Sequence, residues 1–240
     1  MGETITNDKP VIQVKKLRKE YIMGQERVVA LRDINLSIYR GEICCIFGTS
    51  GSGKSTLLNQ LAGLEKPTRG QVLIGGVPVS KLDENQLAAF RQKHVGFVFQ
   101  SYNLLPELTA LENVAMPLMF RGMPKEARER EAMKMLARVG LKDRVHHFPG
   151  QMSGGQQQRA GIARAFITRP DVVFADEPTG NLDSKTTKEV MEMIRSFARK
   201  FNQTIVLVSH DPEMTEYADR IVTLLDGEII SDVKTENTSL

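Results

Sequence analysis

The sequence predicts an α/β protein built on a buried parallel sheet, with a long helical segment inserted into it. Two continuous apolar runs, 172–176 and 204–210, have the composition of central parallel strands, which are covered on both faces. A segment with helical spacing, 185–201, separates these runs, and a mainly helical pattern occupies about 101–165. With 240 residues, the chain can form one ordinary core, or one core with a small subdomain.

The N-terminal part predicts strands followed by one short helix. Residues 11–47 alternate in the manner of strands. Residues 56–64 then have helical spacing, and we expect Gly63 and Pro67 to end this helix. The face that this helix should bury carries Leu57, Leu58 and Leu61. Two further strands are predicted at 70–76 and 95–100.

Within the helical region, residues 123–141 give the strongest helix prediction. Pro124 suits the first helical position, and Gly140 suits the end of the helix. Ala132, Leu136 and Val139 fall on one face of such a helix and should face the core.

The cysteine spacing and the lack of long apolar runs indicate where the chain is located and which kinds of site it does not form. Cys44 and Cys45 are adjacent in an apolar run, a spacing that suits neither a disulfide framework nor a zinc site. They are interpreted as small core residues in a reducing compartment. No apolar run approaches the roughly 20 residues needed to span a bilayer, and residues 1–10 lack the apolar stretch of a signal peptide. We therefore expect a cytoplasmic chain with a flexible N-terminus (1–10) and a loose polar tail (231–240).

The net charge of +3 gives no reason to expect a nucleic-acid partner. The basic clusters at 15–20 and 127–131 are interleaved with acidic or apolar residues, as in solvated faces. His94, His146 and His147 have no metal-ligand context and are interpreted as structural or surface residues.

The stretch between Phe47 and Thr56 predicts a phosphate-binding loop. It fits the pattern G-x-x-x-x-G-K-[ST], follows a predicted strand and opens a predicted helix. Its glycines allow backbone N–H groups to turn toward phosphate oxygens, and the helix N-terminus adds its positive dipole end. Lys54 would reach the β- and γ-phosphates, and the Ser55 hydroxyl would bind Mg²⁺. The loop residues are Gly48, Thr49, Ser50, Gly51, Ser52, Gly53, Lys54, Ser55 and Thr56.

Polar residues at the ends of two buried strands complete a predicted ATP site. Asp176 and Glu177 end one strand, at the edge where open α/β sheets bind ligands. Asp176 can hold Mg²⁺ through water, and Glu177 can orient the attacking water or accept its proton. His210 ends the next strand and is expected to contact the γ-phosphate.

The segment Met152 to Arg159, MSGGQQQR, resembles the signature motif of ATP-binding cassette (ABC) ATPases, which normally has Leu in place of Met152. The resemblance covers roughly 11–230 and includes every motif in order. It implies a P-loop NTPase (RecA-like) core, an antiparallel β subdomain and an inserted α-helical subdomain at about 101–165. It also implies that Tyr21 stacks on adenine, that Gln100 is the Q-loop glutamine, with a part in catalysis and in the Mg²⁺ site, and that Asp183 is the D-loop aspartate.

The resemblance further implies a homodimer. Ser153 can cap a helix beginning at Gly154 and Gly155, whose N–H groups would point outward at an anion. In the family that anion is the γ-phosphate bound by the other subunit, so two chains sandwich two ATP molecules. Glu177, His210, Lys54 and Gln100 are then the expected catalytic residues.

A finer resemblance is to the ATPases of lipoprotein-release, macrolide-export and cell-division (FtsE-like) systems. Its basis is the segments 103–122, 153–165 and 175–184. It implies a separate integral-membrane permease and a peripheral location on the inner face of the cell membrane. Export, lipoprotein release and mechanotransmission remain open, as does the transported substrate.

The alternatives to a transporter subunit are an ABC ATPase that acts on DNA, a translation-associated ABC protein and a nucleotide-sensing module. ABC ATPases that act on DNA carry long coiled coils between the phosphate loop and the signature, but the interval from Thr56 to Ser153 holds no sustained heptad run. Translation-associated ABC proteins need two cassettes, and one is present. A nucleotide-sensing module with negligible turnover is disfavoured by the presence of Glu177 and His210.

Overall fold

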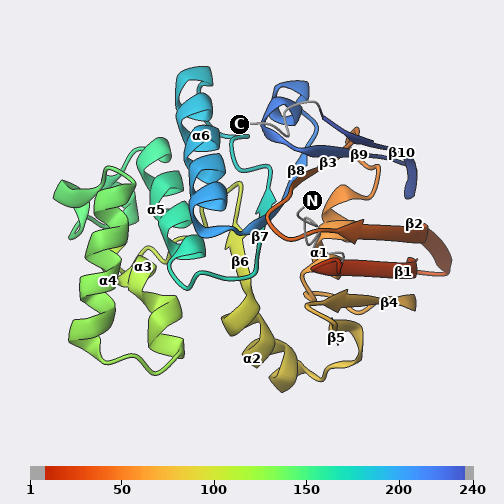
Figure 1. Cartoon of the computed structure of the whole chain (residues 1–240), viewed down its shortest axis with the longest axis horizontal. Coiled ribbons are helices and arrows are strands. Elements are labelled where there is room, and N and C mark those ends of the chain that lie inside the picture. The colour runs from red at the N-terminus through yellow and green to blue at the C-terminus, as the bar shows by residue number, and fades with distance from the viewer. Residues whose placement is uncertain (1–8, 236–240) are drawn as a thin grey trace, which may run out of the picture.

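The structure is a computed structural model that describes residues 9–235, and it consists of two sheets and a helical region (Figure 1). A six-stranded sheet runs through the centre, a four-stranded antiparallel sheet lies to one side, and helices α3 to α5 gather on the other. In the described residues, no helix combines the length and apolarity needed to cross a membrane.

The central sheet has the strand order β10-β9-β3-β8-β7-β6. Strands β9, β3, β8, β7 and β6 are parallel neighbours, and β10 pairs with β9 in the antiparallel sense. The bounds are Ile43–Phe47 (β3), Val95–Val98 (β6), Val172–Asp176 (β7), Thr204–Ser209 (β8), Arg220–Leu225 (β9) and Glu228–Lys234 (β10). The predicted parallel sheet is therefore confirmed.

Two apolar cores cover the two faces of this sheet. Cys45 belongs to the core beneath the helical region, whereas Cys44 belongs to the core that faces the antiparallel sheet. Both thiols are fully buried, as predicted, and burial raises the pKa of Cys45 to about 12. Helices α5 (Gly154–Phe166) and α6 (Ser184–Phe201) cover the first face, and α1 (Lys54–Leu61) covers the second.

The antiparallel sheet has the order β2-β1-β4-β5 and packs on α1. Its strands are β1 (Ile12–Met23), β2 (Glu26–Ile38), β4 (Arg69–Ile74) and β5 (Val77–Pro78). The side chains of Leu57, Leu58 and Leu61 on α1 are buried against this side, as the helical spacing predicted. The helix ends at Leu61, and Gly63 follows with a φ of +64°.

The helical region contains α3 (Ala110–Phe120) and α4 (Lys125–Arg138) beside α5. Thr109 caps α3 through a capping box with Glu112, and the side chain of Asn113 bonds the carbonyls of Leu105 and Leu108. Pro124 is the N-cap of α4 and not its first residue. The apolar face predicted for this helix is buried, with Ala132, Leu136 and Val139 each at most 1% exposed.

Four elements were not predicted from the sequence. They are helix α2 (Glu84–His94) and strands β5, β9 and β10. The polar tail predicted for 231–240 begins as strand instead, because residues 231–234 complete β10 against β9. Residues 1–8 and 236–240, which make up most of the predicted loose ends, lie outside the described residues. Short 3-10 helices lie at Val79–Lys81, Lys142–Arg144, Pro149–Gln151 and Pro212–Tyr217.

Candidate functional site

The predicted phosphate loop connects β3 to α1 at the carboxyl edge of the central sheet. At two positions of this loop, the neighbouring backbone lies too close for any residue larger than glycine. A Cβ on Gly48 would lie 2.3 Å from the carbonyl oxygen of Leu224, and a Cβ on Gly53 would lie 2.7 Å from that of Ala30. Gly53, the N-cap of α1, also has a φ of +101°. The loop is therefore fixed by β2 and β9, with the N-terminus of α1 at its end.

Lys54 and Ser52 leave polar groups within this loop that an anion can engage. The Lys54 side chain is buried, and its Nζ donates to the carbonyl oxygen of Thr49 at 2.7 Å. The Ser52 hydroxyl is buried without a hydrogen-bond partner. A buried lysine, an unpaired hydroxyl and a helix N-terminus form a set of donors that fits phosphate oxygens.

A cleft of about 750 Å³ opens over the loop. One wall comes from β2, and the others come from the loop, the ends of β7 and β8, and the turn between β9 and β10. Its lining includes the predicted residues Ser50, Gly51, Gly53, Lys54, Ser55, Thr56, Glu177 and His210. The structure therefore brings residues from three predicted motifs to one cavity.

Glu177 and His210 form a bonded pair across this cleft from the loop. His210 Nδ1 lies 2.7 Å from Glu177 Oε1, which suits an Nδ1–H that donates to the carboxylate. Glu177 has a φ of +42°, uncommon for a residue with a side chain, and its N–H donates to the carbonyl of Val208 on the neighbouring strand. Strand pairing thus places a carboxylate and an imidazole together at the edge of the sheet.

Asp176 is the last residue of β7 and lies next to this pair. Burial raises the pKa of its carboxyl, and the adjacent Glu177 raises it further, while Lys54 acts in the opposite direction. In the described residues, no group of three or more His, Cys, Asp or Glu side chains could hold a metal ion alone. The donor set suits Mg²⁺, which usually takes one or two protein ligands with water and substrate phosphates.

Gln100 lies two residues beyond β6, at the same edge of the sheet. Its side chain packs against Gly180, where a Cβ would lie 2.7 Å from Gln100 Nε2. Its carbonyl accepts a hydrogen bond from the Asn181 side chain at 3.1 Å. Among the described residues, Gln100 is not one of those that line the cleft.

The signature residues lie at a helix N-terminus, as predicted. Ser153 is the N-cap of α5, and its side chain accepts from the N–H of Gln156 in a capping box. A Cβ on Gly154 would lie 2.7 Å from the Tyr102 hydroxyl, and one on Gly155 would lie 2.7 Å from Thr186 Cγ2. The lining described for the cleft includes none of these signature residues.

Asp183 is the N-cap of α6, next to the start of α5. It accepts hydrogen bonds from the N–H groups of Lys185 and Thr186 and from the Thr186 hydroxyl. These hydrogen bonds lower the pKa of Asp183. The contact between Gly155 and Thr186 places the two helix starts side by side.

Tyr21 lies beside the cleft but is not among the residues described as lining it. The Tyr21 hydroxyl donates to Glu65 at 2.7 Å, and its strand partner Val28 is part of the lining. The ring is therefore held at the margin of the cavity, and its contact with adenine stays a prediction.

Sequence reasoning missed the contributions of β2 and of the last hairpin. Val28, Val29, Ala30 and Arg32 line the cleft, as do Asp226 and Gly227. The Gly227 N–H donates to the carbonyl of Ser52 in the loop, and the Gly227 carbonyl accepts from the Arg32 N–H. The dipeptide Asp226–Gly227 is a turn signal, but no local pattern links it to a loop so far away in the chain.

Comparisons with known proteins agree with this site. The family described as ABC transporter matches residues 31–180. An uncharacterized ABC transporter ATP-binding protein of Thermotoga maritima is 48% identical over 221 residues, which are 92% of this chain and 94% of that protein. The macrolide export ATP-binding/permease protein MacB of Vibrio parahaemolyticus is 46% identical over 92% of this chain, which spans 34% of that protein.

A solved structure extends the agreement to the fold. It is the dimeric, post-hydrolysis state of the ATP-binding cassette MJ0796 bound to ADP and Pi. The similarity has a TM-score of 0.87 at 42% identity and covers 93% of this chain and 98% of that one. The chain therefore belongs to the ABC transporter family, and it is an ATP-binding ATPase cassette with the P-loop NTPase fold.

Proposed function

We propose that this chain hydrolyses Mg²⁺-bound ATP within a homodimer and thereby drives a separate integral-membrane permease. The observation that carries the proposal is the single cleft lined by both the phosphate loop and the Glu177–His210 pair. Binding groups and a candidate base thus share one cavity, as hydrolysis of a terminal phosphate requires.

The phosphate loop binds and orients the triphosphate. Backbone N–H groups of the loop and the N-terminus of α1 attract the phosphate oxygens. Lys54 neutralises charge on the β- and γ-phosphates. Ser55, Asp176 and Gln100 would hold Mg²⁺, which supplies charge neutralisation at the phosphates when it is bound.

Glu177 and His210 position the attacking water. The hydrogen bond from His210 Nδ1 fixes one oxygen of the Glu177 carboxylate, so the other oxygen can accept from water. His210 Nε2 is left to face the γ-phosphate. Gln100 completes this geometry when the helical region moves toward the nucleotide.

The proposed dimer is supported by the N-terminus of α5, which lies outside the described lining of the cleft. Ser153 caps α5, and Gly154 and Gly155 leave its first N–H groups accessible to an anion. In a head-to-tail dimer these groups meet the γ-phosphate held by the partner, and Asp183 lies at the junction. Two ATP molecules are then sandwiched between two chains. The dimeric solved cassette supports such an assembly.

The permease is proposed to dock on the helical side, at the inner face of the membrane. An apolar cleft of about 250 Å³ lies between β6 and α3, and Met119 and Phe120 near its rim are 45% and 56% exposed. Relatives of the MacB type carry a permease in the same protein, which supports export as the direction. Gln100 lies between the nucleotide site and this region and would transmit occupancy of the site to the permease.

Affinity purification tests this proposal. A tagged Glu177→Gln chain is recovered with ATP from detergent-solubilised native membranes, and the co-purifying chains are identified. A multi-span membrane protein is expected with Glu177→Gln, and less of it with the control Lys54→Ala/Glu177→Gln, which should not retain ATP. Recovery of a soluble homodimer alone would contradict the transport role.

A further inference from the structure

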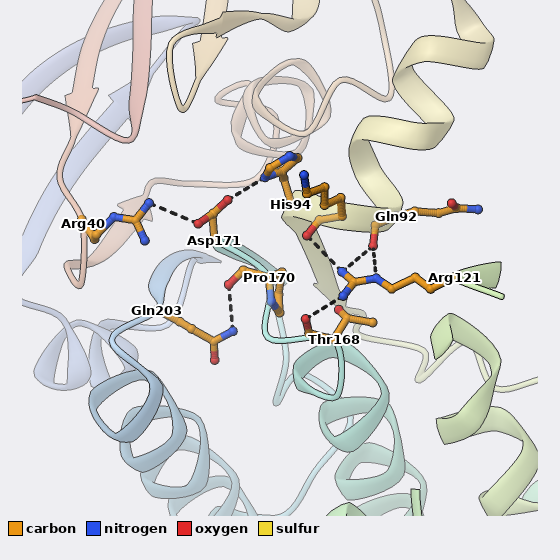
Figure 2. A network of polar contacts seen from close by, with 9 residues as sticks. Arg40, Gln92, His94, Arg121, Thr168, Pro170, Asp171 and Gln203 are labelled. Carbon is orange, nitrogen blue, oxygen red and sulfur yellow. Dashed lines mark hydrogen bonds and ion pairs between the residues drawn. The ribbon is translucent and has the colours of Figure 1, made fainter. Parts of the chain in front are cut away.

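The guanidinium of Arg121 joins three chain segments at the end of α3 (Figure 2). Its Nε and Nη2 donate to the carbonyl of Gln92 at 3.0 and 2.7 Å, and Nη2 also donates to that of Lys93 at 3.0 Å. Its Nη1 donates to the carbonyl of Thr168 at 3.0 Å. All four hydrogen bonds therefore go to backbone oxygens of other elements.

The carbonyls of Gln92 and Lys93 are ones that a helix leaves unpaired, and that of Thr168 lies just beyond a helix. Gln92 and Lys93 lie in the last turn of α2, and Thr168 follows the C-terminus of α5. Carbonyls at a helix C-terminus lack intrahelical partners and carry the negative end of the dipole. A guanidinium, with five donors in a planar fork, satisfies several of them at once, which an ammonium cannot do.

The segments that Arg121 joins belong to a bonded layer at the amino edge of the parallel sheet. His94 Nδ1 lies 2.6 Å from Asp171 Oδ2, and Arg40 donates to the other oxygen of this carboxylate at 3.1 Å (Figure 2). Gln203 donates to the carbonyl of Pro170 at 2.8 Å. Each of these side chains precedes a parallel strand, so the layer is fixed to the sheet.

The two ends of α3 are held in different ways. At its start, the N–H groups of Ala110 and Leu111 donate to the carbonyls of His147 and Val145, within the helical region. At its end, Arg121 bonds to α2 and to the segment after α5. The start of α3 is therefore bonded within the helical region, whereas its end is bonded to segments that precede strands of the sheet.

Arg121 lies beside the apolar cleft, although the described lining does not include its side chain. Two of the residues whose carbonyls it binds, Gln92 and Thr168, line that cleft, as does its neighbour Phe120. We infer that Arg121 is a positioning residue that sets the separation of α3 from α2 and so the width of the cleft. The inference rests on the proposed function for the identity of the partner that the cleft binds. The effect of Arg121 on the separation of α3 from α2 depends on this chain alone.

A distance measurement tests the positioning. Spin labels are placed on cysteines at Val77 on β5 and Met133 on α4, which are both exposed, while Cys44 and Cys45 are buried and stay unlabelled. The parent chain should give one narrow distance distribution without nucleotide. Arg121→Ala should give a broader distribution with a shifted centre, and Arg121→Lys should fall between the two.

Arg128→Ala is the matched control, because Arg128 Nη1 donates to the carbonyl of Met123 within the helical region only. It should retain the parent distribution. An unchanged distribution for Arg121→Ala would overturn the inference. If Arg121→Ala does not fold, Arg121→Lys is measured in its place. A distance distribution identical to the parent's would then overturn the inference.

Two further readouts separate positioning from a general loss of structure. The KM for ATP and the basal turnover of the isolated Arg121→Ala chain should match the parent, because Arg121 lies away from the nucleotide cleft. In the purification described above, the Arg121→Ala change should reduce the recovered membrane protein several-fold, and Arg128→Ala should not. If the parent recovers no membrane protein, the proposed function fails, while the label distances still decide the role of Arg121.

Discussion

Two aspartates at opposite ends of strand β7 show how differently the two edges of the sheet are built. Asp171 precedes the strand at the amino edge. Burial alone would raise the pKa of its carboxyl, but hydrogen bonds from His94 and Arg40 outweigh burial and lower it. Asp176 ends the strand at the carboxyl edge, where burial and Glu177 raise its pKa. One carboxylate already has its hydrogen-bond donors within the protein, and the other lies where a ligand can supply a partner.

The comparison indicates that the amino edge of the sheet contributes to stability and that the carboxyl edge contributes to activity. Side chains at the amino edge bond to one another and to backbone carbonyls. Side chains at the carboxyl edge converge on an open cleft, and His210 is 61% exposed there. Substitutions at the carboxyl edge should therefore alter turnover and affinity, and those at the amino edge should alter the free energy of unfolding.

The largest effect is expected for Glu177→Gln. Loss of the carboxylate that orients water should reduce turnover by about 10²–10⁴-fold, while ATP binding is retained. Phosphate release and ATP binding are measured on the same preparation. Asp226→Asn removes another carboxylate from the lining of the cleft and should keep most of the turnover. Full hydrolysis by Glu177→Gln would exclude Glu177 as the base.

Lys54→Ala should weaken nucleotide binding. A charge-assisted hydrogen bond to phosphate contributes about 1.5–3 kcal/mol, so the Kd for ATP should rise roughly 10- to 150-fold. Calorimetric titration with ATP measures this change. The control is Lys81→Ala, which removes an exposed lysine outside the lining of the cleft. Unchanged affinity in Lys54→Ala would contradict its contact with phosphate.

At the amino edge, Asp171→Asn should lower the free energy of unfolding by roughly 1 kcal/mol, since the ion pairs are partly exposed. The KM for ATP should not change. Because folding lowers the pKa of Asp171, its stabilisation is complete above the ordinary carboxyl value near 4 and is lost as the pH falls further. Urea unfolding at several pH values measures this, with the exposed Asp143→Asn as control. A larger effect on KM than on stability would break the comparison.

The smallest effect is expected for Tyr21, at the margin of the cleft. Loss of stacking in Tyr21→Ala should raise the Kd for ATP about 2- to 10-fold. Tyr21→Phe keeps the ring and loses the hydroxyl that donates to Glu65, so it should keep the affinity of the parent. Equal affinities for all three chains would place adenine elsewhere.

The sequence predicted the parts of the site that lie in short, local patterns. The phosphate loop, Glu177 and His210 are each identified by the residues around them, and the Ser153 cap follows from its helix. Arg32 and Asp226 could not be identified, because they reach the cleft through the pairing of β9 with β3 and the contact of the last hairpin with β2. Arg121 was missed for the same reason, since its partners are backbone oxygens and any residue supplies one.

The contact between the last hairpin and the phosphate loop also has a consequence for synthesis of the chain. The Gly227 N–H bonds the Ser52 carbonyl, and Leu224 packs against Gly48. The loop thus leaves the ribosome long before the last hairpin, which helps to fix it. At about 5–20 residues per second, it waits on the order of ten seconds or more for its support. A nascent cassette should therefore complete its nucleotide site only when translation has reached the final hairpin.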